Sequence, residues 1–163
     1  SLLEIPIIFV VENNMFGSHM HINYRQTAIS TARFAKANNI DYEIVDGNNV
    51  IEIEQVSKKA IENARLHNKP FFIEAITYRF YGHVDWREDV DVGINRSLED
   101  LKSWKSNDPI LLLKNAMIEN SFLNKDYYKK LEIKMQKKID IAWNKALNDP
   151  YPKLESLLNR VYK

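Results

Sequence analysis

Three short runs of β-branched and aromatic residues alternate with two stretches of helical periodicity in the first 80 residues. The runs lie at residues 5–11, 42–45 and 71–78, and the helical stretches lie at residues 27–37 and 50–67. This alternation is typical of βαβ units, which build a parallel sheet. The third run is apolar on both faces, as in a sheet that helices cover on both sides. We therefore predict an α/β fold, with a partial doubly wound parallel sheet in which residues 5–11 form a buried central strand.

Residues 79–96 lose this periodicity, and their glycines and acidic side chains predict a long loop. Long loops in compact domains are usually functional or mobile, and we expect residues 81–95 to be mobile without ligands. Helical patterns follow at residues 98–104, 109–118, 125–148 and 153–161, with Asp108 in the N-cap position of the second. We thus expect an α/β part at residues 1–80, a loop at 81–96 and a helical C-terminal region at 97–163.

Composition excludes several classes of protein. The 163 residues carry 23 Lys and Arg against 22 Asp and Glu, so the net charge of +1 gives no overall field to hold nucleic acid. The lysines of residues 125–138 alternate with acidic residues, which favours a solvated helix face. No apolar run approaches the ~20 residues of a membrane-spanning helix. The chain has no cysteine, which excludes thiolate metal sites and is compatible with the cytoplasmic location that we expect.

Candidate ligands follow the first predicted strand. In open parallel sheets, ligands bind beyond the carboxyl ends of the strands. Asn13 and Asn14 stand at such an end, before a turn at Gly17. Side-chain amide oxygens and an exposed backbone carbonyl suit Mg²⁺ that bridges a phosphorylated cofactor. Asn-Asn before Gly is also typical of an ordinary loop, which we favour from these residues alone.

A second candidate follows the third predicted strand, where Arg79 and His83 stand. A histidine in this position can stabilise a developing negative charge or transfer a proton near neutral pH. A single histidine next to glycine is also typical of a solvated loop, and from the residues alone we again favour the loop.

Four blocks of sequence together resemble a known family. They are residues 6–14 (PIIFVVENN), 45–48 (VDGN), 73–79 (IEAITYR) followed by Gly82 and His83, and 108–110 (DPI). Their order and spacing resemble the alpha subunit of the thiamine-diphosphate-dependent 2-oxo acid dehydrogenases, the group of the pyruvate, branched-chain 2-oxo acid and acetoin dehydrogenases. The resemblance covers nearly the whole chain. It implies the thiamine-diphosphate-binding fold, with residues 1–80 as the C-terminal half of that domain.

The resemblance also implies roles for individual residues. Asn14 would bind Mg²⁺ through its side-chain oxygen, and Phe16, where the family usually has tyrosine, would bind it through its backbone carbonyl. His83 would be the catalytic histidine on the loop over thiamine diphosphate, and Arg79 would help to hold that loop. His19 and His21 could line the entrance to the site, but we favour solvated loop histidines for both.

Several departures from the family pattern limit these expectations. The Gly-Asp-Gly motif, whose aspartate is another Mg²⁺ ligand in the family, is absent, and Asp46-Gly47 resembles a structural turn instead. We therefore expect an incomplete domain that is inactive alone and binds the cofactor weakly. Val84 stands where mitochondrial members carry a phosphorylatable serine, so control by the dedicated kinase is not expected. The unusual stretch at residues 86–88 leaves the substrate undefined.

The expected activity is thiamine-diphosphate-dependent oxidative decarboxylation of a 2-oxo acid, with transfer of the acyl group to a lipoyl group. By the resemblance, the partners are a beta subunit in an α2β2 heterotetramer, which contributes the glutamate that activates the cofactor, and a lipoyl acyltransferase. Two alternatives stay open. One is another thiamine-diphosphate enzyme of transketolase-like or sugar-modifying type, and the other is a non-catalytic fragment that only pairs with a partner subunit.

Overall fold

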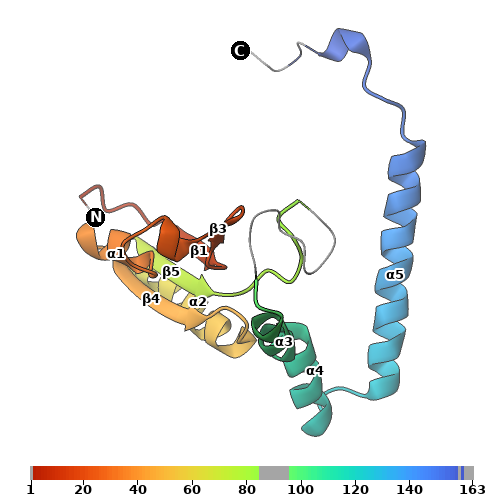
Figure 1. Ribbon diagram of the computed structural model, residues 1–163, viewed down its shortest axis with the longest axis horizontal. Helices are drawn as coiled ribbons and strands as arrows, with labels where there is room; N and C mark the ends of the chain where they lie inside the picture. The colour runs from red at the N-terminus through yellow and green to blue at the C-terminus, as the bar shows by residue number, and fades with distance from the viewer. Residues whose placement is uncertain (1, 85–95, 158, 160–163) are drawn as a thin grey trace. The chain divides into compact units, whose positions relative to one another are not determined.

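The computed structural model describes residues 2–84, 96–157 and 159 (Figure 1). It divides into two compact units, Ser1–Leu113 and Lys114–Lys163, which we describe separately. In chain order the elements are β1 (Ile8–Asn13), β2 (Phe16–Gly17), β3 (Met20–His21), the 3₁₀ turn η1 (Ile22–Tyr24), α1 (Ala32–Ala37), β4 (Asp41–Asp46), α2 (Val50–His67), β5 (Phe71–Ile76), α3 (Leu98–Ser106), α4 (Pro109–Glu119), α5 (Lys125–Asn148) and the 3₁₀ turn η2 (Leu154–Ser156).

The first unit is built on a three-stranded parallel sheet with the order β1-β5-β4. Ile8 and Asp41 both lie opposite Phe71, so the three strands start in step and end in step. This confirms the α/β class and the parallel sheet. The larger doubly wound sheet stays a prediction.

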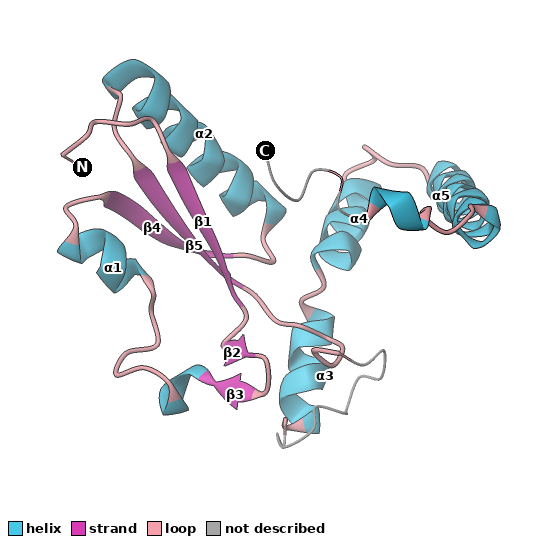
Figure 2. Cartoon of the chain, turned by 90° about the horizontal axis from the view of Figure 1, so that it is seen from above, coloured by secondary structure: helices cyan, strands magenta, loops and turns pink. Residues whose placement is uncertain are grey.

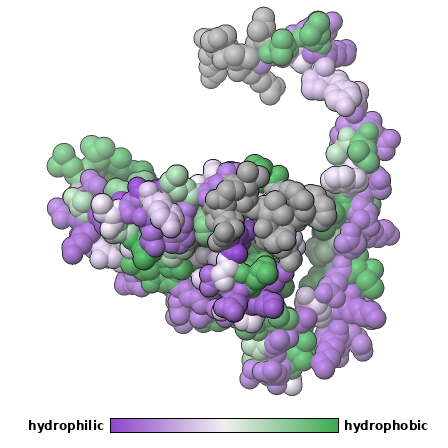
Figure 3. Space-filling view, in the orientation of Figure 1, coloured by the Kyte–Doolittle hydropathy of each residue, from purple (hydrophilic) through white to green (hydrophobic). Residues whose placement is uncertain are grey.

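In the described chain β5 is the central strand, with its first five residues buried, whereas β1 is at an edge and leaves Phe9 43% and Val10 60% exposed. The buried central position that we expect for residues 5–11 belongs to the larger doubly wound sheet and stays a prediction with it. Exposed apolar side chains also gather on the segment before β1, at Leu2 and Leu3 (Figure 3).

Helix α2 has the predicted bounds because side chains define both of its ends. The side-chain oxygen of Asn49 accepts the backbone N–H groups of Ile51 and Glu52, which satisfies the first turn. The helix ends at Asn68, which adopts a left-handed conformation with φ of 51°. Between these ends, Val56 and Ala60 pack against β5.

Helices α1 and α2 cover opposite faces of the sheet (Figure 2). On one face α2 packs against Phe71 and Ile73, and on the other face α1 packs against Phe72. Helix α1 begins at Ala32, five residues later than predicted. The reason is that the amides of Thr31 and Ala32 donate hydrogen bonds to the Glu74 carboxylate, which satisfies the first turn at that point.

A small antiparallel hairpin, β2-β3, follows β1 and was not predicted. Its strands have two residues each, with Phe16 opposite His21 and Gly17 opposite Met20. Strands this short carry no detectable alternation. The hairpin and the turn η1 are anchored by Ile22, whose side chain is 1% exposed and whose N–H donates to the carbonyl of Met15 at 2.7 Å.

Helix α3 belongs to the same compact unit as the sheet. The ring of Trp104 stacks on Tyr78 with centroids 5.4 Å apart, and Leu101 is buried. The buried Asn48 accepts from the Thr77 hydroxyl at 2.8 Å and donates to the carbonyl of Asn107 at 2.9 Å. The first compact unit therefore continues to Leu113. The division that we expected, with a helical region at residues 97–163, stays a prediction.

In the second unit, α5 has the predicted bounds but no buried residue. The apolar face expected on it, which includes Leu131, Met135 and Ile139, is exposed. Of the helix predicted at residues 153–161, the described residues form only the turn η2. Among the described residues, no helix is both long enough and apolar enough to cross a membrane.

The turn after β4 gives the first testable prediction. A Cβ at Gly47 would lie 2.8 Å from the carbonyl oxygen of Ile76 and 3.2 Å from Ala75. Gly47→Ala is therefore expected to lower the free energy of unfolding by about 1–3 kcal/mol, because backbone atoms must move to accept the methyl group. Urea denaturation followed by circular dichroism measures the loss.

Gly17→Ala is the matched control, because the atoms nearest to its Cβ would be those of the Arg25 guanidinium, at 2.7 Å. That flexible side chain can move away, so we expect a smaller loss. Equal losses for the two variants would contradict the steric explanation.

Candidate functional site

The carboxyl ends of β1 and β5 lie side by side. Asn13 and Ile76 are opposite each other at the last position of the paired register. The pairing continues one residue further, because the N–H of Thr77 donates to the carbonyl of Asn13 at 3.0 Å. The two candidate segments of the sequence therefore start at the same edge of the sheet, as ligand sites in parallel sheets do.

The segment after β1 forms what we call the asparagine turn, residues 13–17. The side-chain oxygen of Asn13 accepts the N–H of Met15 at 3.0 Å, and that of Asn14 accepts the N–H of Phe16 at 2.9 Å. These are two consecutive Asx turns. Met15 has a φ of 66°, an uncommon conformation for this residue type. Side-chain hydrogen bonds thus stabilise a backbone that would not form by propensity alone.

Ser18 joins the two segments and was missed by the sequence reasoning. Its hydroxyl lies 3.3 Å from Nε2 of His83, and its carbonyl accepts from Arg79 Nη2 at 3.2 Å. Arg79 Nη1 also lies 3.2 Å from Nδ1 of His83. The structure thereby brings Arg79 and His83 to the hairpin that follows Asn14. No residue type or spacing signals Ser18, whose role depends on contacts 61 and 65 residues away.

The contact with Arg79 defines the hydrogen-bonding character of His83. A guanidinium can only donate, so Nδ1 of His83 must accept, and the proton of the neutral ring then lies on Nε2. The His83 ring is exposed. This arrangement presents an N–H donor at the edge of the sheet where we expect the ligand.

Our preference for solvated loop histidines at positions 19 and 21 is wrong. The rings of His19 and His83 meet edge to face with centroids 5.9 Å apart. His21 packs on Phe16 at 5.0 Å, and its Nδ1 accepts the N–H of Asn23 at 3.2 Å. Both side chains are partly buried because the hairpin β2-β3, which we did not predict, turns them towards the site.

Arg96 supports the His83 segment from the far end of the loop. Its guanidinium donates to the carbonyl of Arg79 and, at 3.1 Å, to that of Tyr81, and it lies 5.5 Å from the ring centroid of Tyr78. Arg79 Nε also donates to the Tyr81 carbonyl, at 3.0 Å. Residues 85–95, which include Trp86, lie outside the described residues, so our expectation of a mobile loop stays a prediction.

A cavity of about 1130 Å³ opens beside the asparagine turn. Its wall combines aromatic side chains with polar groups, which include those of Ser18 and Asp100. Its volume is comparable to that of sites for cofactors or drug-sized molecules. Residues that line it include Met15, Phe16, His19, Tyr78, Arg96 and Trp104.

The oxygens of the asparagine turn fit part of a magnesium site. The donors available there are an amide oxygen from Asn14 and the backbone carbonyl of Phe16, and hard oxygen ligands suit Mg²⁺. Among the described residues, no group of three His, Cys, Asp or Glu could hold a metal ion. Asn14 and Phe16 therefore supply a minority of an octahedral shell, which leaves most positions for other oxygens.

Glu74 is a buried carboxylate behind the asparagine turn. Burial raises its pKa, but hydrogen bonds from the Ser30 hydroxyl, the Thr31 amide, the Asn13 side chain and the Ala32 amide lower it more, so the pKa lies below its ordinary value of 4.5. Its side chain is fully buried, with 0% of its surface exposed. The carboxylate is thus ionised and fully hydrogen-bonded at neutral pH.

Comparison with known proteins identifies the family. The model of the family described as "Dehydrogenase E1 component" matches residues 1–155. The chain belongs to this family. Within it, the chain is 30% identical to the mitochondrial pyruvate dehydrogenase E1 component subunit alpha of Sminthopsis macroura, over 162 residues. It is 31% identical to the corresponding alpha subunit of Porphyra purpurea, over 156 residues.

These alignments cover 99% and 96% of this E1 chain but 44% of each relative. A testis-specific mitochondrial alpha subunit of Rattus norvegicus is 31% identical over 99% of the chain and 40% of its own length. The chain thus spans less than half the length of the curated relatives that it matches. Its resemblance to the alpha subunits of 2-oxo acid dehydrogenases, noted from four blocks of sequence, is confirmed.

The lowered pKa of Glu74 predicts how the stability of this E1 chain depends on pH. A carboxylate with a depressed pKa stabilises the folded state above pH 4.5, and this stabilisation is lost as the pH falls through the folded-state value. The free energy of unfolding should therefore fall as the pH drops below 4.5, and it should fall less steeply in Glu74→Gln.

Denaturant unfolding at a series of pH values from 7 to 3 measures both slopes. Glu54→Gln is the control, because Glu54 is exposed and pairs with Lys58 on the helix surface. If Glu74→Gln and the parent lost stability in parallel, the assignment of Glu74 as the titrating group would be wrong.

Proposed function

We propose that this chain is part of the alpha subunit of a 2-oxo acid dehydrogenase that uses thiamine diphosphate and Mg²⁺. In the reaction a 2-oxo acid loses CO₂, its acyl group forms a thioester with one sulfur of a lipoyl disulfide, and the second sulfur leaves as a thiol. The observation that carries the proposal is the junction at Ser18, which brings Arg79 and His83 to the hairpin that follows Asn14. The family match supports it.

In this proposal, the asparagine turn holds the metal through the Asn14 side chain and the Phe16 carbonyl. Arg79 supplies a positive charge next to His83, where the diphosphate would carry negative charge. Thiamine diphosphate, when bound, supplies the stabilised carbanion chemistry that decarboxylation needs. The protein contributes position, charge and exclusion of water.

His83 contributes a hydrogen-bond donor. Arg79 occupies Nδ1, so the ring presents Nε2–H, which is directed to the hydroxyl of Ser18 in this structure. That N–H can also be donated to an oxygen on which negative charge develops, and a donor positioned there stabilises this charge.

The proposed partners follow from the size of the chain and the names of its relatives. The relatives are E1 alpha subunits of pyruvate dehydrogenase, and the chain matches less than half of each. We propose that the other metal ligands come from the rest of the alpha subunit, that a beta subunit completes the site in an α2β2 heterotetramer, and that a lipoyl acyltransferase accepts the acyl group. The identity of the 2-oxo acid is left open.

His83→Ala tests the proposed catalytic role. In the complete alpha subunit, assembled with its beta partner, we expect turnover to fall by about a hundredfold to a thousandfold, which is typical for loss of a fixed donor to developing charge. The fold should remain, because the ring is exposed and its removal opens no core cavity. Steady-state rates with pyruvate or branched-chain 2-oxo acids, at saturating cofactor, measure the effect.

His67→Ala is the matched control, because His67 is an exposed histidine in the last turn of α2. It should keep the parental rate. Near-normal turnover in His83→Ala would remove His83 from the mechanism. An assembled parent complex with no thiamine-diphosphate-dependent decarboxylation would favour the non-catalytic alternative.

Asn14→Ala should act differently, on the metal and not on the chemical step. We expect the Mg²⁺ concentration for half-maximal activity to rise about tenfold or more, with much of the rate recovered at high Mg²⁺, because one oxygen ligand is lost. Titration of activity with Mg²⁺ at fixed cofactor measures it. Asn120→Ala, an exposed asparagine of the second unit, is the control, and an unchanged requirement in Asn14→Ala would refute its assignment as a ligand.

A further inference from the structure

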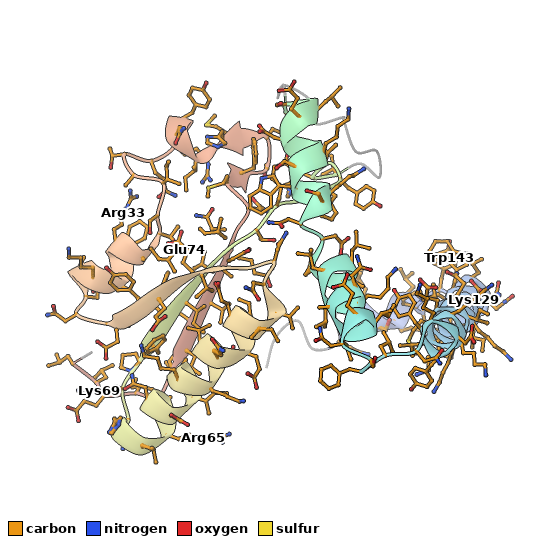
Figure 4. All side chains as sticks on the ribbon, turned by 90° about the horizontal axis from the view of Figure 1, so that it is seen from below. Arg33, Arg65, Lys69, Glu74, Lys129 and Trp143 are labelled. Atoms are coloured by element: carbon orange, nitrogen blue, oxygen red, sulfur yellow. The ribbon has the colours of Figure 1, made fainter. Side chains whose placement is uncertain are left out.

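We propose that Glu74 is a positioning residue for the metal-binding turn. It touches neither Asn14 nor Phe16, and it acts on them through Asn13. The inference rests on the proposed function for the identity of the ligand, although the contacts that carry it are independent of that identity. Figure 4 shows Glu74 on the face of the sheet that carries α1.

Glu74 accepts hydrogen bonds from separate parts of the chain. Oε1 accepts from Asn13 Nδ2 at 2.7 Å and from the Thr31 amide at 2.9 Å. Oε2 accepts from the Ser30 hydroxyl at 2.5 Å and from the Ala32 amide at 3.0 Å. The side chain has no exposed surface, so these four donors replace all of the water that an ionised carboxylate needs.

Asn13 transmits the position of Glu74 to the turn. Its amide nitrogen donates to Glu74, and its amide oxygen accepts the N–H of Met15. Because the amide group is planar, fixing the nitrogen side also fixes the direction of the oxygen. That oxygen holds Met15 at its φ of 66°, and Met15 is the residue between the two proposed metal ligands. Glu74 therefore controls the spacing of the two ligands without touching either.

A carboxylate is the only side chain that suits this position. Every group that reaches Glu74 is a donor, and an ionised carboxylate accepts with both oxygens and donates nothing. Glutamine has nearly the same shape but would turn one NH₂ group towards donors. Glu74→Gln consequently breaks the contact to Asn13 or the contacts to the start of α1, with little change in volume.

The test uses the complete alpha subunit in complex with its beta partner. We expect Glu74→Gln to weaken Mg²⁺ binding, measured by calorimetry in the presence of thiamine diphosphate, by about tenfold to a hundredfold, as is typical when a residue behind a metal ligand is removed. The turnover at saturating Mg²⁺ should stay close to that of the parent. Hydrogen–deuterium exchange of the amides of Met15 and Phe16 should become faster, both with and without Mg²⁺ and cofactor.

Val56→Ala is the matched control for loss of stability. Val56 is buried on the other face of the sheet, so its truncation destabilises the protein without touching the contacts of Glu74. Its Mg²⁺ affinity should remain parental at a comparable loss of melting temperature. If Val56→Ala weakened Mg²⁺ binding as much as Glu74→Gln does, the effect would be general destabilisation and the inference would be wrong.

A rescue variant tests the contact itself. Adding Asn13→Asp to Glu74→Gln exchanges donor and acceptor at this contact, so the introduced NH₂ group can donate to the introduced carboxylate, which still accepts from Met15. Two mismatches remain, because the NH₂ group also faces the Thr31 amide and the Ile29 carbonyl loses the donor Asn13 Nδ2. We therefore expect the pair to recover only part of the lost Mg²⁺ affinity, but to bind Mg²⁺ more tightly than Asn13→Asp alone, which places two carboxylates together. Equal Mg²⁺ affinity in the pair and in Asn13→Asp alone would overturn the inference.

The exchange measurement separates this inference from the proposed function. If exchange at Met15 is unchanged in Glu74→Gln, the positioning role is wrong, whatever the complex binds. If exchange becomes faster but the parent binds neither Mg²⁺ nor thiamine diphosphate, the positioning role of Glu74 is supported and the proposed function fails.

Discussion

The parallel pairing of β1 with β5 is the constraint on which the candidate site depends. It places Asn13 opposite Ile76 and so starts the asparagine turn and the His83 segment at one edge of the sheet. A shift of this register by one residue would turn each side chain to the opposite face of the sheet. Glu74 would then lose its contacts with α1 and with Asn13. The sheet therefore determines which segments lie side by side at the site, and the side-chain contacts then stabilise the conformation of those segments.

Two kinds of hydrogen bond then complete the site, and they differ in how exposed they are. The hydrogen bonds of Glu74 are buried. Loss of one of their donors would leave the buried carboxylate without a partner and would lower the free energy of unfolding. The contacts among Ser18, Arg79 and His83 are exposed, where water can replace them. The asparagine turn is thus held by buried contacts, whereas the His83 segment is held by exposed ones. In the proposed function, the buried contacts would lie behind the metal and the exposed contacts would lie beside the reacting groups.

The sequence predicted the features that depend on neighbouring residues. It predicted the bounds of α2, which Asn49 and Asn68 define, and the burial of β5, whose residues other than Glu74 are apolar. It did not predict the strand order β1-β5-β4, because that order depends on pairing between residues about 60 positions apart. Ser18 and Glu74 were also missed as functional residues. Glu74 lies within a recognised block, yet its role becomes visible only when Asn13 and Ser30 are brought to it.

The same register has a consequence for the order in which the chain folds. β4 and β5 pair across 30 residues and are linked by α2, whereas β1 must find β5 across 63 residues. Closing the longer loop costs more entropy, so β4-α2-β5 is expected to form first and β1 to join an existing sheet edge. Asn13 meets Glu74 only at that late step. The asparagine turn would then be among the last parts of the first unit to become ordered. During synthesis of the chain, it can form only after β5 has been synthesised.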